Sequence, residues 1–466
     1  MKFLQRRSAS LLFACALILA SRLVHAQSFE SSGGDSAYSN PDLAASTARP
    51  WNPPEPVAAA RPWERALRFP GAVISWPLRQ LGRGAEAGMT WVDANEIQQK
   101  TVEILSQRGH WGVDLVPASL GDGTGFGGEF RTTPTFLRQH FTGAVSASMQ
   151  GYNREEATVS CGWLALGWRN EWRPRERFYG VGMTPSSEVS TYGVQTQSAL
   201  LSLSIGTPFG AKTIAEPIQP SVDARMRPHP KHRTQLRAWT GPREAVMTNG
   251  RDFDRPSIEV AHPELAAMSL HHHVEQLSSG ITLTHDERFG SPHWSNGWRA
   301  SGEIERRDDP FRGLQFRNVD TDAQSFTRIT GKIEAGTSFG RDPRTIRLAF
   351  KAVDTRPDGS GVFLLDDLAT LGGPELAGFE RGRFHDFDLV LGKLTYVYPL
   401  LRNLELDLHG ESGEVCPTLG GAQFTKLEQS MGFALRLRSD DALVGWMGFD
   451  FSREMTRFRF GFGGVE

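Results

Sequence analysis

The decapeptide FTRITGKIEA, residues 326–335, alternates its side chains with a period of two. Phe326, Arg328, Thr330, Lys332 and Glu334 share one face of such a segment, and Thr327, Ile329, Gly331, Ile333 and Ala335 share the other. Because successive side chains of a β-strand point to opposite faces, the pattern predicts a strand with one polar and one largely apolar face. The same alternation recurs in WRASGEIE (298–305), TIRLAFKA (345–352), NLELDLHGE (403–411) and TRFRFGF (456–462).

These segments favour a membrane barrel over a soluble half-buried sheet, which is the alternative. Their polar faces are often fully charged, and their apolar faces combine leucine and aromatic residues with glycine. Strands of about ten residues, joined by short turns and some long polar stretches, are typical of transmembrane barrels. In lipid every backbone group needs a partner within the protein, so the strands must close into a ring. We expect an all-β fold over residues 110–466: a transmembrane antiparallel β-barrel of sixteen strands.

The N-terminal part predicts export. Basic residues precede an apolar run at 11–20, which is followed by the small-x-small sequence Val24-His25-Ala26. This is the pattern of a signal peptide over residues 1–26. Residues 27–60 are rich in Ser, Ala, Gly and Pro and are expected to be a flexible linker. Residues 61–109 are expected to form a short periplasmic amphipathic helical segment, with docking on the membrane surface as the alternative.

Composition excludes several classes of protein. After residue 26 no stretch approaches the roughly 18 apolar residues of a transmembrane helix. The formal net charge is −2, and nothing in the sequence indicates nucleic-acid binding. Cys161 and Cys416 are too few for a disulfide-stapled scaffold of this size, and they are either independent thiols or one pair. An exported chain with these strands is expected in the bacterial outer membrane.

Three stretches of the second half carry a resemblance to a known family. ITLTHDERFGSPHWSNGWRASGEIE (281–305) has a strand, an Asp-x-Arg turn, Pro and Gly, and a second strand. LGGPELAGFERGRFHD (371–386) is a long glycine-rich loop, and MGFALRLRSDDALVGWMGFDFSREMTRFRFGFGGV (431–465) has the pattern of closing strands. In their order and spacing these stretches resemble the outer-membrane barrel of the BamA/TamA family, the bacterial surface antigen superfamily. The positions that match the family's turn are Asp286, Arg288, Pro292 and Gly297.

The resemblance implies a role for the loop at 371–386. In the family this loop folds back into the barrel lumen, where an arginine at its tip pairs with acidic residues of the inner wall. Here the tip reads Leu376-Ala377-Gly378-Phe379, so Ala377 stands at the position of the family's arginine. Gly378 is expected to permit a tight turn, and Phe379 is expected to pack as a plug. The residues of this motif are Gly372, Gly373, Ala377, Gly378, Phe379, Arg381, Arg383 and Phe384.

Two arrangements of the loop remain open from the sequence. Arg381 or Arg383 takes over the pairing, with Glu405, Asp407 or Glu411 of the inner wall as the acidic partner. Alternatively the loop packs only through Phe379 and Phe384, and the arginines face water. The family's insertases and translocases also carry periplasmic receptor domains before the barrel. Residues 27–109 lack that pattern, so the sequence resembles a branch without those domains.

The other groups of residues that could carry chemistry do not indicate an enzyme. His271 and His273 share a strand face, but no carboxylate or cysteine lies at a spacing that completes a metal site, so we expect no metal there. His285 and Asp286 would point to opposite faces of a strand, which does not suit a hydrolase. The glycine-rich GDGTGFGGEF (121–130) precedes no helix that could hold a phosphate. We expect no catalytic residues and no cofactor.

The function implied by the resemblance is insertion or translocation of protein or lipid at the outer membrane. The weak seam would lie between Trp111–Pro117 and Phe458–Phe462, since unpaired strand edges are templates for an incoming strand. The expected partners are outer-membrane lipid and unfolded outer-membrane or secreted proteins, with the barrel itself monomeric. The alternative is a passive diffusion pore or a structural barrel without insertase activity, in which Arg347, Lys351, Arg457 and Arg459 would line a channel.

Overall fold

The structure is a computed structural model. It describes residues 113–118, 127–132, 140–183, 189–206, 233–252, 254–270, 272–288, 296–309, 324–339, 344–359, 363–401, 404–423, 426–438 and 443–462. The expected signal peptide, linker and helical segment, residues 1–26, 27–60 and 61–109, lie outside the described residues, as do Trp111 and Pro292.

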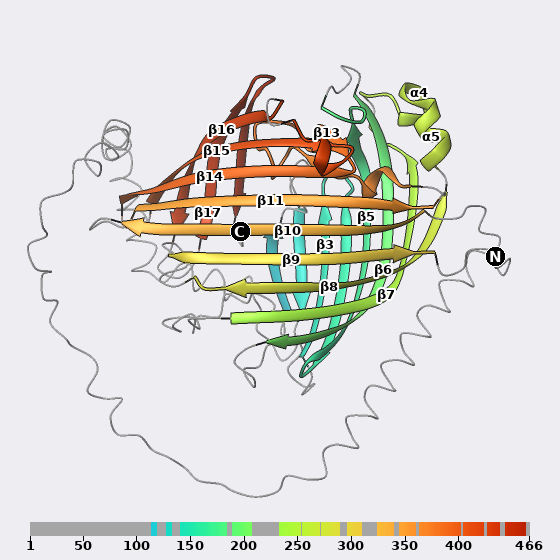
Figure 1. Cartoon of the computed structure of the whole chain (residues 1–466), viewed down its shortest axis with the longest axis horizontal. Coiled ribbons are helices and arrows are strands. Elements are labelled where there is room, and N and C mark those ends of the chain that lie inside the picture. The colour runs from blue at the N-terminus through green and yellow to red at the C-terminus, as the bar shows by residue number, and fades with distance from the viewer. Residues whose placement is uncertain are drawn as a thin grey trace, which may run out of the picture. The chain divides into compact units, whose positions relative to one another are not determined.

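One antiparallel sheet of sixteen strands makes up most of the described chain (Figure 1). Each strand pairs with the next along the chain, except that β11 pairs with β14. The strands are β1 (Val113–Ala118), β2 (Gly127–Thr132), β3 (His140–Ser148), β4 (Asn153–Cys161), β5 (Leu164–Phe178), β6 (Ser190–Gly206), β7 (Arg233–Asn249), β8 (His273–Asp286), β9 (Gly297–Asp308), β10 (Ser325–Phe339), β11 (Arg344–Asp358), β14 (Asp388–Leu401), β15 (Leu404–Cys416), β16 (Glu428–Arg438), β17 (Leu443–Ser452) and β18 (Thr456–Phe462).

The remaining elements lie in the connections. The segment between β11 and β14 contains the 3₁₀ turn η2 (Leu365–Asp367) and the small hairpin of β12 (Ala369–Leu371) with β13 (Phe384–Asp386). The short helices α4 (Ile258–Ala261) and α5 (Pro263–Ser269) connect β7 to β8, and η3 (Leu419–Gly421) follows β15. None of the helices in the described ranges is long and apolar enough to cross a membrane.

The two faces of the sheet differ as the alternation predicts. On β10 Phe326 is fully buried on the inward face, while Ile329 and Ile333 are exposed on the other. The exposed apolar side chains continue across the register, for example from Ile281 to Ile304 to Ile329. So large an exposed apolar face is unusual for a soluble monomer, and it suits contact with lipid tails. The predicted all-β, sixteen-stranded antiparallel architecture is confirmed.

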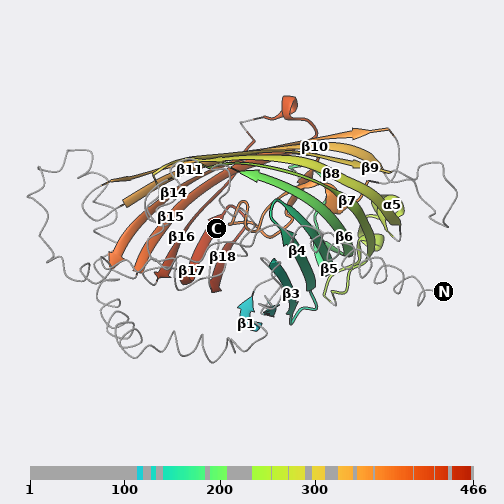
Figure 2. The ribbon, with the colours of Figure 1, turned by 90° about the horizontal axis from the view of Figure 1, so that it is seen from below.

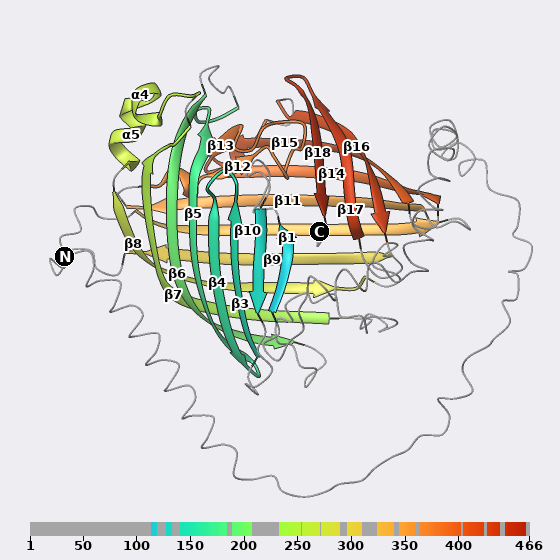
Figure 3. The ribbon, with the colours of Figure 1, turned by 180° about the vertical axis from the view of Figure 1, so that it is seen from behind.

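The sheet is strongly curved, and its two edge strands face each other (Figures 2 and 3). No ladder joins β1 to β18 among the described residues, so the sheet stays open where a closed ring was expected. These edge strands have six and seven residues, whereas β5 to β7 have 15 to 17. Short edges offer few backbone groups for pairing, which gives a physical reason for closure to fail at this place.

The buried apolar residues gather on the inward side of the sheet, around the β11–β14 connection. One cluster joins Leu364, Leu365 and Leu368 of the connection to β5–β8 and to the helices α4 and α5. A second cluster joins Leu371, Leu376, Phe379 and Phe384 to β11, β14 and β15. The connection therefore supplies much of the core that the inward face of the sheet packs against.

The outward apolar face predicts that an added charge lowers stability more on that face than on the inward face. Ile304→Lys places an ammonium on that face, and we expect it to lower the free energy of unfolding in lipid by about 2 kcal/mol or more. Ser301→Lys adds the same charge to the inward face of the same strand and should change stability much less. Urea titration of the two variants in lipid vesicles measures the difference, and equal losses would contradict the assignment of the faces.

Candidate functional site

The candidate site is the inward segment, which we define as residues 363–388 between β11 and β14. Figure 3 shows its hairpin of β12 and β13 on the inward side of the sheet. The segment contacts strands from β5 at one side to β18 at the other. It therefore connects parts of the sheet that are far apart in the strand order.

Two acidic residues of the segment meet four arginines of the sheet's inner wall, three through their carboxylates and one through a backbone carbonyl. Asp366 lies 2.6 Å from the guanidinium of Arg173 on β5. Asp367 lies 3.1 Å from Arg243 on β7 and pairs with Arg307 on β9. Arg328 on β10 donates to the backbone carbonyl of Asp367. We call Arg173, Arg243, Arg307 and Arg328 the arginine cluster.

Burial makes this contact energetically important. The side chain of Asp367 is 3% exposed and that of Arg243 is 11% exposed. Burial raises the pKa of Asp366, but the charges of Arg173 and Arg243 outweigh it and hold that pKa below its ordinary value. Removing one partner of such a pair leaves a buried charge uncompensated and typically costs 3–5 kcal/mol. The ionic contact therefore fixes the position of η2 against the wall.

Past η2 the backbone turns sharply. Gly372 has φ 113°, and a Cβ there would collide with the carbonyl oxygen of Glu380. Leu376 has φ 79°, the one described residue besides glycine with positive φ, and its side chain is fully buried. Lys351 of β11 lies 2.6 Å from Glu375 and supports this turn. A tight turn also lies at Gly378, where the N–H of Phe379 donates to the carbonyl oxygen of Leu376 at 3.1 Å.

At the tip, Ala377 takes part through its backbone. Its N–H donates to Glu411 Oε2 on β15 at 2.5 Å, and Ser430 of β16 donates to the same oxygen at 3.1 Å. Lys393 Nζ lies 3.0 Å from Glu411 Oε1. Arg457 of β18 donates to the carbonyls of Ala377 and Phe379. An arginine from the wall and a carboxylate from the wall therefore hold the tip.

A glycine is required at position 378 because the backbone there lies very close to the strands of the wall. A Cβ at this position would lie 2.8 Å from the carbonyl oxygen of Phe451 and 2.8 Å from Ser430 Cβ. Phe379 and Phe384 are fully buried, with ring centroids 5.2 Å apart in an edge-to-face arrangement. The plug expected of Phe379 is therefore formed by both rings together.

Arg381 and Arg383 pair with acids, though not with those expected. Arg381 lies 3.6 Å from Glu176 on β5. Arg383 forms a two-pronged contact with Glu454 in the β17–β18 turn, at 2.7 and 3.0 Å, and its guanidinium lies 4.6 Å from the centroid of the Tyr179 ring. Leu371 pairs with Phe384 in the hairpin register, so both arginines lie in the loop of the hairpin.

The expected acid partners serve other groups. Glu411 accepts the hydrogen bond from the backbone N–H of Ala377. Asp407 lies 2.7 Å from Arg436 and 2.9 Å from His409 Nδ1, and His409 Nε2 lies 2.6 Å from Asp450. Glu405 is buried farther along β15. These acids stabilise the wall of β15–β18 itself.

Glu380 joins the segment to the end of β5. Arg177 lies 2.6 Å from its carboxylate, and the Tyr179 hydroxyl donates to the same carboxylate. Burial opposes ionisation of Glu380, but these two contacts hold its pKa below the ordinary value. Burial and the neighbouring carboxylate raise the pKa of Tyr179 to about 12. Glu380 is therefore a third acid of the segment that meets a wall arginine, after Asp366 and Asp367.

The expected family turn is also present in part. Asp286 accepts hydrogen bonds from the backbone N–H of Arg288 at 3.0 Å and from its guanidinium at 2.9 and 2.8 Å. Gly297 has φ 101°, and a Cβ would collide with the carbonyl oxygen of Glu287. The sequence spacing thus identified a turn in which three of the four expected residues have local structural roles.

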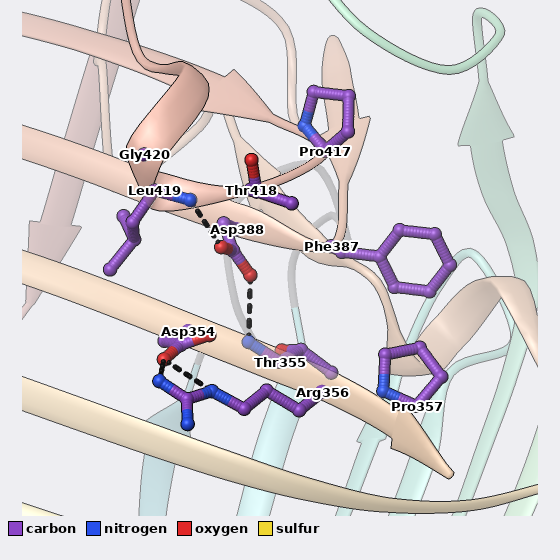
Figure 4. Close-up of a pocket in the computed structure, with 10 residues that line it drawn as sticks. All are labelled: Asp354, Thr355, Arg356, Pro357, Phe387, Asp388, Pro417, Thr418, Leu419 and Gly420. Carbon is purple, nitrogen blue, oxygen red and sulfur yellow. Dashed lines mark hydrogen bonds and ion pairs between the residues drawn. The ribbon is translucent and has the colours of Figure 1, made fainter.

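A pocket of about 600 Å³ opens where β11 and β14 separate (Figure 4). Backbone pairing of these strands ends at Val353 and Leu389. Asp388 then accepts the N–H of Thr355 at 2.7 Å and of Leu419 at 2.6 Å. For Thr355 of β11 this carboxylate takes the place of a strand partner, and for Leu419 it accepts the first N–H of η3. The pocket is lined by Asp354, Thr355, Arg356, Pro357, Phe387, Asp388, Pro417, Thr418, Leu419 and Gly420.

Other clusters of polar residues are smaller. Glu244, His273 and Glu275 offer ligand atoms within 4.8 Å of one another, so this half-buried set could hold a metal ion, although the sequence pattern indicated none. His285 lies 2.8 Å from Thr234 and 3.0 Å from Glu287, without the serine that a hydrolase would require among these contacts. Cys161 and Cys416 are free thiols, which decides between the two alternatives for them.

No family model matches the sequence, and no curated protein matches it. Among solved structures the chain is similar to BamA from Haemophilus ducreyi lacking POTRA domains 1–3, with 11% identity and a TM-score of 0.47 over 78% of this chain and 77% of that one. It is similar to CdiB from Escherichia coli, with 11% identity and a TM-score of 0.42 over 76% of this chain and 60% of that one.

A third solved structure is Wzi from Escherichia coli, an outer membrane protein involved in group 1 capsule assembly and a carbohydrate-binding β-barrel. Its identity to the chain is 9% and its TM-score is 0.27, over 80% of this chain and 84% of that one. The first of these proteins, BamA, shares its name with the family that the sequence motifs resemble.

Sequence reasoning missed the arginine cluster and its partners Asp366 and Asp367. The four arginines lie on four different strands between positions 173 and 328, so no local spacing connects them. The adjacent acids in LLDDLATLGG (364–373), directly before the glycine-rich loop, are the one signal in the sequence that could have indicated an anchor there.

Arg383→Ala removes the two-pronged pair with Glu454 and the contact with Tyr179. Because Glu454 would lose its partner, we expect the melting temperature to fall by about 2–4 °C. The matched control is Arg356→Ala, because Arg356 is 70% exposed beside Asp354 and an exposed pair contributes little. Circular dichroism melting in detergent micelles compares the two variants. Equal shifts would mean that Arg383 does not support the inward segment.

His385 on β13 predicts a pH dependence of stability. Burial lowers the pKa of His385 to about 4, and its Nδ1 has no hydrogen-bond partner among the described residues. Between the unfolded value of about 6.5 and the folded value, only the unfolded chain binds the proton. The free energy of unfolding should therefore fall as the pH decreases from 6.5 towards 4, by up to about 1.4 kcal/mol per pH unit.

The matched variant is His385→Gln, which does not titrate in this range. Urea unfolding in vesicles at pH 6.5 and pH 5 should show a loss for the wild type that exceeds that of the variant by up to about 2 kcal/mol. A variant with the same pH dependence as the wild type would show that the buried imidazole is not its source.

Proposed function

We propose that this protein is an outer-membrane β-barrel that assists insertion or translocation of protein or lipid through the seam between β1 and β18. The observation that carries the proposal is the open sheet, in which two short edge strands face each other without a ladder among the described residues (Figure 3). An unpaired edge offers N–H and C=O groups to an incoming strand. An unfolded outer-membrane or secreted protein is the client that this chemistry suits.

The inward segment supports the proposal because it holds the wall without closing the seam. It binds β5 through Asp366 and Glu380, and it binds β15 and β18 through Glu411 and Arg457. A barrel whose edges separate must retain its shape by other contacts. In this proposal the exposed apolar face contacts outer-membrane lipid, and one copy of the chain is sufficient.

The alternative is a diffusion pore or a structural barrel. Of the four basic residues expected to line a channel, Lys351 contacts Glu375 and Arg457 contacts backbone carbonyls of the inward segment, while Arg459 pairs with Asp450. These contacts favour a lumen that the segment occupies. A pore would therefore require the inward segment to move out of the lumen.

The experiment locks the seam. Cysteines at Leu115 and Phe460, two positions that alternate to the same face of the sheet, in a Cys161→Ser, Cys416→Ser background, should form a disulfide across the edges under oxidising conditions. We expect a strain that depends on this variant to lose defined outer-membrane or secreted proteins and to accumulate their precursors in the periplasm, with recovery in a reductant. Quantitative proteomics against the parent strain measures the loss.

The matched control is a cysteine pair at Ser301 and Lys332, which are register partners on β9 and β10. This pair cross-links two strands that are already joined, so the proteome should not change. A deletion strain with an unchanged proteome, or a locked seam without effect, would overturn insertion and translocation and leave the pore or the structural barrel.

A further inference from the structure

The arginine cluster carries more positive charge than the wall around it can balance. Its four guanidinium groups face two wall carboxylates, Glu305 at 2.7 Å from Arg307 and Glu176 at 4.0 Å from Arg173. Asp366 and Asp367 of the inward segment supply the remaining negative charge. If the segment left, the wall would present a concentrated positive site to the lumen.

We propose that the arginine cluster is a binding site for small oxyanions, such as inorganic phosphate, which Asp366 and Asp367 occupy here, and that displacement of the inward segment opens an anion-selective pathway along the inner wall. The guanidinium fork matches the oxygens of a carboxylate and of a phosphate equally well. Rings of arginine and lysine make pores selective for anions and phosphate. This activity is separate from insertion at the seam.

The arginines are positioned by the wall itself. Arg243 donates to Gln276 at 3.2 Å, Arg328 donates to Thr355 at 3.2 Å, and Arg307 donates to Glu305 at 2.7 Å. The guanidinium groups of Arg307 and Arg328 both lie over the ring of Phe326, at 5.1 and 5.2 Å from its centroid. Phe326 is fully buried. Side chains of the wall therefore hold the guanidinium groups from the side opposite to Asp366 and Asp367.

The two carboxylates that occupy the cluster belong to one short element of the inward segment. Asp366 and Asp367 lie in a single 3₁₀ turn, so both carboxylates leave the cluster when that turn moves. A buried ionic network is seldom more stable than an apolar one of the same volume.

The experiment measures ion conduction by the full-length protein in planar lipid bilayers. Asp366→Asn with Asp367→Asn removes both charges of the resident ligand with little change in volume. We expect a several-fold increase in conductance, a reversal potential in a KCl gradient that indicates a preference for chloride, and a decrease in chloride current when inorganic phosphate is added. The decrease with phosphate tests the site directly.

The matched control is Asp354→Asn with Asp358→Asn. It makes the same change in charge on β11, where both carboxylates pair with partly or largely exposed arginines, Arg356 and Arg306. Its conductance should equal that of the wild type. Adding Arg243→Gln and Arg307→Gln to the first variant should remove the chloride preference and the effect of phosphate.

Three results would overturn the proposal: a folded Asp366→Asn, Asp367→Asn variant that conducts like the wild type, a preference for potassium, or a chloride current that phosphate does not change. Should the double variant fail to fold, Asp366→Asn alone applies the same test with a smaller expected increase. Because no client protein is present in the bilayer, the outcome is independent of the proteome measurement on the seam.

Discussion

The ion pairs between Asp366 and Asp367 and the arginine cluster are the interaction on which the inner structure depends. They hold η2 against β5, β7, β9 and β10, and from this point the chain continues as a hairpin that reaches β15 and β18. The apolar clusters on both sides of the segment form only when it is held there. In a sheet with an open seam, these contacts connect β5 and β7 to β15 and β18, which lie far from them in the strand order.

In this interaction the segment carries the acids and the wall carries the arginines, whereas the family resemblance implies the reverse. The family's loop brings an arginine to acids of the wall, whereas this segment brings Asp366, Asp367 and Glu380 to arginines of the wall. At the tip, Ala377 leaves Glu411 to accept a backbone N–H, and Arg457 on β18 supplies the guanidinium from the other side. The folded-in segment thus combines acids that meet wall arginines with Arg381 and Arg383, which meet Glu176 and Glu454.

The two faces of the sheet meet opposite physical demands. The outward face exposes Leu348, Phe350, Phe458 and Phe460, which lipid would cover at little cost. The inward face carries arginines and acids, which require partners when they are buried. The inward segment supplies those partners, so the sheet and the segment are each incomplete alone.

The sequence by itself determined the strand pattern, the face to which each side chain points, and the presence of a folded loop before β14. These properties follow from a period of two and from turn residues such as Asp286, Arg288 and Gly297, which act over a few positions. Only the tertiary structure decided the partners of Arg381 and Arg383, the need for Gly378, and the meeting of Asp366 and Asp367 with four arginines. Such contacts join residues up to about two hundred positions apart, as Arg173 and Asp366 are. Their geometry follows from the curvature of the sheet and the register of the β12–β13 hairpin, which no local pattern encodes.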